Sequence, residues 1–345
     1  MFEKIDFIER KLRYTFDDLD LLHQALTHKS GVNEGYASCH NEALAWLGQS
    51  LLSASMAEIL YDIYPNYDEG SLTEKRAELL SKQRLFNVAK TLGLHKHSFC
   101  MGFGERRQWD NNKPLQQQIT VQSFKALLGA VFIESDGDFS HIKEFVADYW
   151  IIAWSTNNRL LGTETSNYLD DLAMTPKCAT AVRTLFGFRV HVKHNERLEF
   201  LGDALLGAAV SYQLYQTTST VSQLTQRKAE LINNKQLADC ATYNGLDQRI
   251  RLRGETIENI YGLRRERLLA NCYEASLAVR YLTQRRKFSS LKTAVFELIR
   301  CNTLNTDRPM NSSKATSYFY SESSSCHAYA EGCASNETLD VFVLQ

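Results

Sequence analysis

Two carboxylates four residues apart are the first feature of this sequence that suggests chemistry. Glu199 and Asp203 lie within the stretch HNERLEFLGDA, residues 194–204. Residues four apart share one face of a helix, so these side chains would bring two negative charges together. Their repulsion is offset when a cation lies between them. An E-x-x-x-D pair alone is more often a solvated helix face, so the metal interpretation depends on the residues around it.

A second pair of oxygen ligands lies in the stretch LLANCYEASLAV. Asn271 and Glu274 are three residues apart and would also share a helix face. If the two helices face each other, three carboxylates and one amide oxygen meet in one pocket. Such hard ligands select Mg²⁺ or Mn²⁺, which can activate water and stabilise the oxygens of a phosphodiester undergoing displacement. The predicted catalytic and metal-binding set is Glu199, Asp203, Asn271 and Glu274.

The same motif occurs earlier in the chain without its charges. HNEALAWLGQS, residues 40–50, has Ala45 and Gln49 where the later copy has its Glu and its Asp. Other blocks recur in the same order: 72–94 aligns without gaps on 224–246, 121–134 on 270–283, and 21–30 more loosely on 168–177. Repeated blocks in one order indicate a duplicated domain. We expect domains at 1–150 and 151–300.

Apolar periodicity predicts an all-α fold. Residues recur at three- and four-residue spacing over 43–62, 72–93, 120–133, 139–153, 197–215, 224–243 and 264–283. Strand-like alternation is scarce, and Pro65 lies where the first of these helices should end. The remaining segments are predicted as an exposed loop at 102–118, an interdomain linker at 155–167, and a disordered tail at 301–345.

Length and composition fit an ordinary globular protein. The 345 residues suit two domains of about 150 residues each, and 44% hydrophobic with 23% charged residues are typical values. The eight cysteines show no metal-binding spacing and are predicted to be free thiols. We find no signal or transit peptide and no apolar run of membrane-spanning length. We therefore expect a soluble intracellular protein without a membrane partner; nucleus and cytoplasm are not distinguished.

Basic residues concentrate in the later part of the chain. The net charge of −1 argues against a protein that coats nucleic acid through bulk charge. From Arg227 onward, however, the second half carries a run of basic residues with fewer acids between them: Arg249, Arg251, Arg253, Arg264, Arg265, Arg267, Arg280, Arg285, Arg286 and Lys287. Charge alone leaves two interpretations open, a solvated helical face and a surface that binds a polyanion.

HNERLEFLGDA resembles the signature of the ribonuclease III family. The resemblance covers roughly 1–150 and 160–290, including QALTHKS ahead of the first copy. It implies all-helical domains that work in pairs as Mg²⁺- or Mn²⁺-dependent endonucleases on double-stranded RNA, leaving 5′-phosphate and 3′-hydroxyl ends. Two such domains in one chain are similar to the Dicer and Drosha arrangement, an intramolecular pseudo-dimer.

The resemblance places the family's metal-binding acids on both halves. In the second half they fall on the predicted set, with Asn271 in place of an acid. In the first half they fall on Ala45, Gln49, Gln122 and Lys125, which include no carboxylate, and an ammonium at Lys125 would repel a metal ion. The first domain is therefore expected to be degenerate. A further acid of the family pattern falls on Glu69, and its counterpart in the second half is Val221.

The sequence therefore predicts an endoribonuclease with a single active centre that cuts one strand of double-stranded RNA. The expected RNA-facing residues are Glu196, Arg249, Arg251, Arg253, Arg264 and Arg265. The alternative is a catalytically inactive protein of the same fold that binds double-stranded RNA or serves in assembly, and a third interpretation is a helical interaction module. No double-stranded-RNA-binding domain is found after residue 290, so a partner protein that binds RNA or a second copy of the chain is expected.

Overall fold

A computed structural model describes residues 2–32, 39–97, 113–150, 166–177, 183–185, 188–190, 194–217, 220–252 and 257–305. Its first half contains α1 (Phe2–Leu12), α2 (Leu19–Leu26), α3 (Lys29–Val32), α4 (Glu42–Ile63), α5 (Glu69–Leu79), α6 (Lys82–Thr91), α7 (Leu94–His97), α9 (Lys113–Glu134) and α10 (Ser140–Trp150). Its second half contains α12 (Ser166–Ala173), β1 (Arg183–Leu185), β2 (Phe188–Val190), α13 (Glu196–Tyr215), α14 (Val221–Leu231), α15 (Asn234–Tyr243), η2 (Ile257–Asn259), α16 (Gly262–Thr283), η3 (Phe288–Leu291) and α17 (Lys292–Asn305). The all-α prediction is confirmed.

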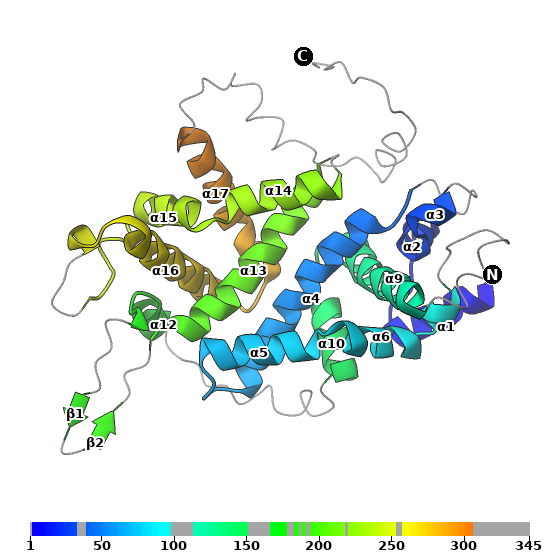
Figure 1. The fold of residues 1–345 in the computed structure, drawn as a ribbon, viewed down its shortest axis with the longest axis horizontal. Helices are drawn as coiled ribbons and strands as arrows, with labels where there is room; N and C mark the ends of the chain where they lie inside the picture. Colours follow the sequence, from blue (N-terminus) through cyan, green and yellow to red (C-terminus); the bar gives the residue numbers. More distant parts are fainter. Residues whose placement is uncertain are drawn as a thin grey trace, which may run out of the picture.

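Two long helix pairs form the core. In the first half α4 packs along α9, and in the second half α13 packs along α16; α4 and α13 then pack against each other in the middle of the molecule (Figure 1). By length and composition α4 could cross a membrane, but 72% of its most apolar window is buried inside the fold. Among the described residues no other helix passes this test. The apolar character of α4 is that of a central core helix.

A buried asparagine precedes each of the helices α4 and α13, and it makes equivalent hydrogen bonds in the two halves. The backbone N–H of Asn41 donates to the Thr27 carbonyl at 3.0 Å, and that of Asn195 donates to the Thr175 carbonyl at 2.9 Å. Both asparagines are buried, at 0% and 1% exposure. Paired contacts of this kind show that the two halves repeat one another in three dimensions.

The expected alignment of 21–30 on 168–177 is wrong by one residue. The side chain of Asn41 donates to the Ala25 carbonyl at 3.0 Å, and that of Asn195 donates to the Ala173 carbonyl at 3.3 Å. These bonds pair Ala25 with Ala173, whereas the expected register pairs Ala25 with Leu172. Few identical residues in this block fix its register, so the sequence alone did not exclude the slip.

Close backbone approach occurs at equivalent glycines in the two halves. A Cβ atom placed on Gly48 of α4 would lie 1.9 Å from the carbonyl oxygen of Lys125 on α9. A Cβ atom placed on Gly202 of α13 would lie 1.9 Å from the carbonyl oxygen of Glu274 on α16. The structure therefore puts Lys125 and Glu274 at corresponding places, as the sequence repeat predicted.

Two expected long helices are each divided in two. The segment 72–93 becomes α5 and α6, and the segment 224–243 becomes α14 and α15. Ser81 and Asn233 adopt extended backbone before the second helix of each pair, and the Asn233 side chain accepts from the Gln236 N–H at 2.9 Å. N-cap residues start a new helix even where the apolar spacing continues through the break.

Several expected boundaries also shift. Helix α9 starts at Lys113, so the last part of the expected loop 102–118 is helical; residues 102–112 lie outside the described residues. The antiparallel pairing of β1 with β2 was not predicted, because each strand has only three residues. The helices expected over 43–62, 197–215 and 264–283 are confirmed as α4, α13 and α16.

The expected linker and tail are mostly not described. Helix α10 ends at Trp150 and α12 begins at Ser166, and residues 151–165 between them lie outside the described residues. Helix α17 runs to Asn305, so the first residues of the expected disordered tail are helical; 306–345 lie outside the described residues. The four described cysteines are free thiols, as predicted: Cys39, Cys240, Cys272 and Cys301.

A buried ionic network joins the two halves. The guanidinium of Arg286, which follows α16, donates to Glu58 at 2.9 Å and to Asp62 at 2.6 Å, both on α4. Glu58 is 1% exposed and also accepts from the Tyr281 hydroxyl at 2.7 Å. The interpretation of Arg286 as part of a polyanion-binding surface is therefore wrong, because its charge is used within the fold.

We predict that Arg286→Met lowers the free energy of unfolding by about 3–5 kcal/mol, because it leaves the buried Asp62 without its cation and Glu58 with only Lys143, at 3.5 Å. The matched control is Arg84→Met, which removes an exposed ion pair with Glu78 and should cost less than about 1 kcal/mol. Urea unfolding measures both. Equal losses for the two variants would show that the network adds nothing beyond a surface ion pair.

Candidate active site

The structure brings the four predicted site residues together. Glu199 and Asp203 lie one turn apart on α13, and Asn271 and Glu274 lie on α16, which packs along α13. The Asn271 side chain donates a hydrogen bond to Glu199, which offsets a small part of the rise in pKa that burial and neighbouring charges give this carboxyl. The close approach of the two helices at Gly202 is what places these side chains within one pocket.

Burial raises the pKa of all three carboxylates, and repulsion by neighbouring carboxylates raises the pKa of Glu199 and Glu274 further. Burial, followed by the charges of Glu69 and Glu196, raises the pKa of Glu199 to about 8. Burial and then the charges of Asp203, Glu199 and Glu69 raise the pKa of Glu274 well above its ordinary value. Burial also raises the pKa of Asp203. The pocket therefore holds negative charge at a free-energy cost that a cation would offset.

Helix α5 of the first half covers this pocket. Burial raises the pKa of Glu69, and the charges of Glu196 and Asp203 raise it further. The guanidinium of Arg76, on the same helix, lies 4.7 Å from the centre of the Phe200 ring and lowers the pKa of Asp203. The sequence identified Glu69 as an acid of the first half but gave no sign that it would lie beside the site of the second.

The donor set fits a divalent cation. The Oε2 atom of Glu199 is buried without a hydrogen-bond partner, and carboxylate oxygens are the ligands that Mg²⁺ and Mn²⁺ prefer. Within the described ranges, no three His, Cys, Asp or Glu side chains are already spaced to hold a metal. The pocket thus supplies suitable oxygen ligands, but the described side chains are not yet arranged around a single metal position.

The first-half counterpart is a pocket of different chemistry. Its volume is about 620 Å³, and its lining includes Ala45, Gln49, Gln122 and Lys125. The amide of Gln122 donates to the Asn41 side chain at 2.8 Å. Val221, at the start of α14, lines this pocket from the second half, as Glu69 approaches the other site from the first.

The residues expected to face RNA lie on several elements. Arg249, Arg251 and Arg264 are exposed, Arg265 is half-buried in the first turns of α16, and Arg253 lies outside the described residues. Arg251 is paired with Asp171 at 2.7 Å. Glu196 is paired with Lys177 at 2.9 Å, and its charge raises the pKa of Glu199, so it lies beside the carboxylate pocket without being one of the four predicted ligands.

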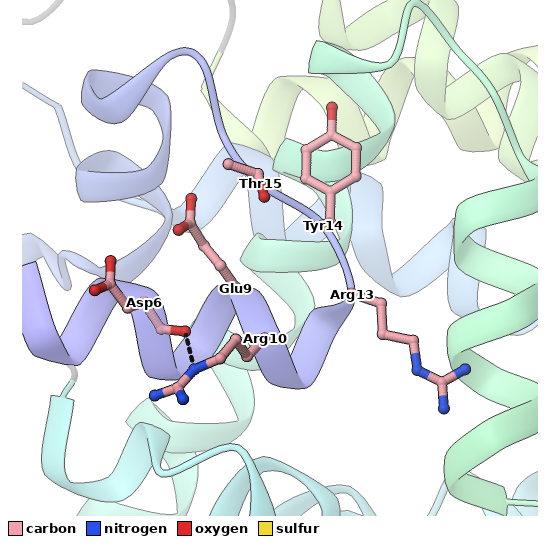
Figure 2. A pocket seen from close by; sticks show the side chains of 6 residues that line it. All are labelled: Asp6, Glu9, Arg10, Arg13, Tyr14 and Thr15. Atoms are coloured by element: carbon pink, nitrogen blue, oxygen red, sulfur yellow. Dashed lines mark hydrogen bonds between the residues drawn. The ribbon is translucent and has the colours of Figure 1, made fainter.

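A separate pocket of about 520 Å³ lies at the end of α1 (Figure 2). Three of the four charged residues around it are already engaged: Arg10 donates to the Asp6 backbone carbonyl at 3.1 Å, Glu9 accepts from the Phe16 N–H at 2.8 Å, and Arg13 pairs with Asp148 at 2.7 Å. None of the predicted site residues lines it. We therefore do not assign chemistry to this pocket.

Comparison with known proteins finds similarity over most of the chain. The family model described as Ribonuclease-III-like matches residues 18–152 and 187–300. Ribonuclease 3 of Ralstonia pickettii is 31% identical over 196 residues, 56% of this chain and 72% of the relative. Ribonuclease 3 of Photorhabdus laumondii is 39% identical over 132 residues, 38% of this chain and 54% of the relative.

A solved nuclease domain of ribonuclease III from Campylobacter jejuni is 30% identical; the match covers 42% of this chain and 94% of that domain, with a TM-score of 0.37. Ribonuclease 3 of Cupriavidus taiwanensis, 31% identical, is matched over 64% of its length. The chain belongs to the ribonuclease-III-like family and carries two domains of that type in tandem.

The raised pKa of Glu199 predicts a pH-dependent stability in the metal-free protein. A carboxyl whose folded pKa is about 8 and whose ordinary value is 4.5 binds more protons folded than unfolded between these values. The free energy of unfolding should therefore fall by at least about 1 kcal/mol as pH rises from 5 to 8 in EDTA.

The matched variant is Glu199→Gln, which keeps the shape of the side chain but does not titrate. Denaturant unfolding across pH should give a shallower profile for this variant. Added Mg²⁺ should flatten the wild-type profile, because the ion stabilises the charged carboxylates. If wild type and variant show the same dependence of unfolding free energy on pH, the pKa of Glu199 is not raised in the folded protein.

Proposed function

We propose that the protein is an Mg²⁺-dependent endoribonuclease that hydrolyses double-stranded RNA at a single centre in its second domain. One observation carries this proposal: the half-buried carboxylates of Glu199 and Glu274 crowd together with Asp203 between two packed helices, and the Oε2 atom of Glu199 is buried without a hydrogen-bond partner. Crowded carboxylates with strongly raised pKa values are unfavourable unless a ligand compensates their charge, and such sites are candidates for function. Membership of the ribonuclease-III-like family supports the same reaction class.

Each residue of the pocket has a distinct role in this proposal. Glu199, Asp203 and Glu274 would hold Mg²⁺ or Mn²⁺, and Asn271 orients Glu199 through its hydrogen bond. When bound, the ion would supply activation of water and neutralisation of charge at the phosphodiester. The cations Arg76 and Lys228 favour the charged form of Asp203, which is the form that would bind the ion.

A single centre would cut one strand of a bound duplex. The corresponding pocket of the first half has Ala45, Gln49 and Lys125 at the ligand positions, which cannot hold a divalent cation. A staggered double cut would need a second active domain, from another copy of this chain or from another ribonuclease. Duplex RNA would be recognised through its shape and phosphates, with exposed arginines supplying part of the affinity and a partner protein supplying more.

We predict that purified protein with Mg²⁺ nicks a duplex RNA whose two strands carry different 5′ labels. Glu274→Gln should lower the rate at least about 100-fold, because loss of a metal ligand should cost at least as much as loss of a residue that only hydrogen-bonds to a ligand. The matched control, Glu230→Gln, makes the same exchange at an exposed position of α14 and should keep full activity. Denaturing gels resolve each labelled strand. Equal cleavage by wild type and Glu274→Gln would reject the proposed site.

The alternative function is duplex binding without turnover. It is favoured by Asn271, which brings no charge to the pocket and cannot act as a base. In that case wild type would bind the duplex with an affinity that falls as salt rises, and Mg²⁺ would release no product from either strand. The strand-resolved gel and a binding titration on the same RNA together decide between the two functions.

A further inference from the structure

The pocket of the first half occupies the place that the carboxylate pocket occupies in the second. Contacts across the two halves are reciprocal: Arg76 lies over the ring of Phe200, and Lys228 lies 5.7 Å from the ring centre of Trp46. Glu69 approaches one pocket and Val221 lines the other. Reciprocal contacts of this kind define a pseudo-twofold relation, so the two pockets are equivalent by geometry as well as by sequence.

The charge of the first pocket is reversed. Its charged lining residues are Lys82, Lys125 and Glu42. Glu42 is already paired with Lys29 at 3.3 Å. The pocket therefore presents two ammonium groups and one carboxylate whose charge is compensated from outside the pocket.

Lys125 is the central cation of this pocket. Among the described residues it has no hydrogen-bond or ion-pair partner, and burial lowers its pKa. A partly buried ammonium without a counter-ion is unfavourable, and an anion beside it would restore the lost interactions. Helix α6 also begins here, with Lys82, and its N-cap Ser81 makes no side-chain capping bond, so backbone N–H groups at that end add to the favourable field for an anion.

We propose that this pocket binds a backbone phosphate of the RNA strand that is not cut, with Lys125 as the contacting cation. This inference rests on the proposed function. The two strands of a duplex are themselves related by approximate twofold axes, so a phosphate at the carboxylate pocket implies a matching phosphate of the opposite strand near the pseudo-symmetric position. There the ammonium replaces the metal ion as the positive charge, and it holds the strand without hydrolysing it.

The test is a binding titration with the full chain. All proteins carry Glu274→Gln to suppress cleavage, and fluorescence anisotropy with a labelled RNA duplex is followed in Mg²⁺ at several KCl concentrations. Adding Lys125→Met should weaken binding several-fold and reduce the slope of log K against log salt by about one, the value for a single lost phosphate contact. Lys125→Arg, which keeps the charge, should retain the slope.

The matched control is Lys292→Met, which removes an exposed lysine at the start of α17. It should leave affinity and slope unchanged. Lys125→Gln provides the same test if the Met variant does not fold, as judged by its unfolding midpoint.

Each outcome separates the two claims. Unchanged affinity and slope in Lys125→Met, or an equal loss in Lys292→Met, overturns the phosphate pocket while the proposed function stands. If neither the Glu274→Gln parent nor the wild-type protein binds the duplex, the proposed function falls and this inference falls with it.

Discussion

Gly202 lets the backbone of α16 approach α13 until any side-chain carbon at that position would collide with the carbonyl oxygen of Glu274. Because the helices are this close, Glu199 and Glu274 are partly desolvated, and neighbouring carboxylates, Asp203 among them, raise their pKa values further. A wider spacing would leave the same residues as a solvated face. The site thus depends on a packing contact made by a residue with no side chain.

The first half has an equivalent close approach of its two helices, but without carboxylates beside it. Gly48 allows an equally close approach at Lys125, so the helix pair survives although no acid remains at the corresponding positions. Packing and catalysis therefore place separate demands on the repeated motif. Apolar residues such as Leu44 and Leu47, both at 0% exposure, keep the fold, while the residues that face the pocket are free to change charge.

Pairing of the halves makes each pocket a product of both domains. Helix α5 brings Glu69 and Arg76 to the second-half site, and α14 brings Val221 to the first-half pocket. The buried network of Arg286 with Glu58 and Asp62 fixes this arrangement. One chain therefore supplies both members of the dimer that the family resemblance implies.

Periodicity and internal repetition predicted the all-α fold, the tandem domains and the helices that carry the four site residues. They did not predict the breaks at Ser81 and Asn233, because N-caps act locally while the apolar spacing continues. They misplaced Arg286, since a list of charges does not show which are paired inside the fold. The approach of Glu69 to the other half follows from packing between domains, which no local pattern encodes.

The central claim is that one half of this chain binds a divalent cation and the other does not. It is tested most directly by a crystal soaked in Mn²⁺, with an anomalous difference map collected near the manganese edge. The account predicts manganese bound among Glu199, Asp203 and Glu274 and no peak beside Lys125. No peak at the carboxylates, or a peak in the first-half pocket, would contradict it.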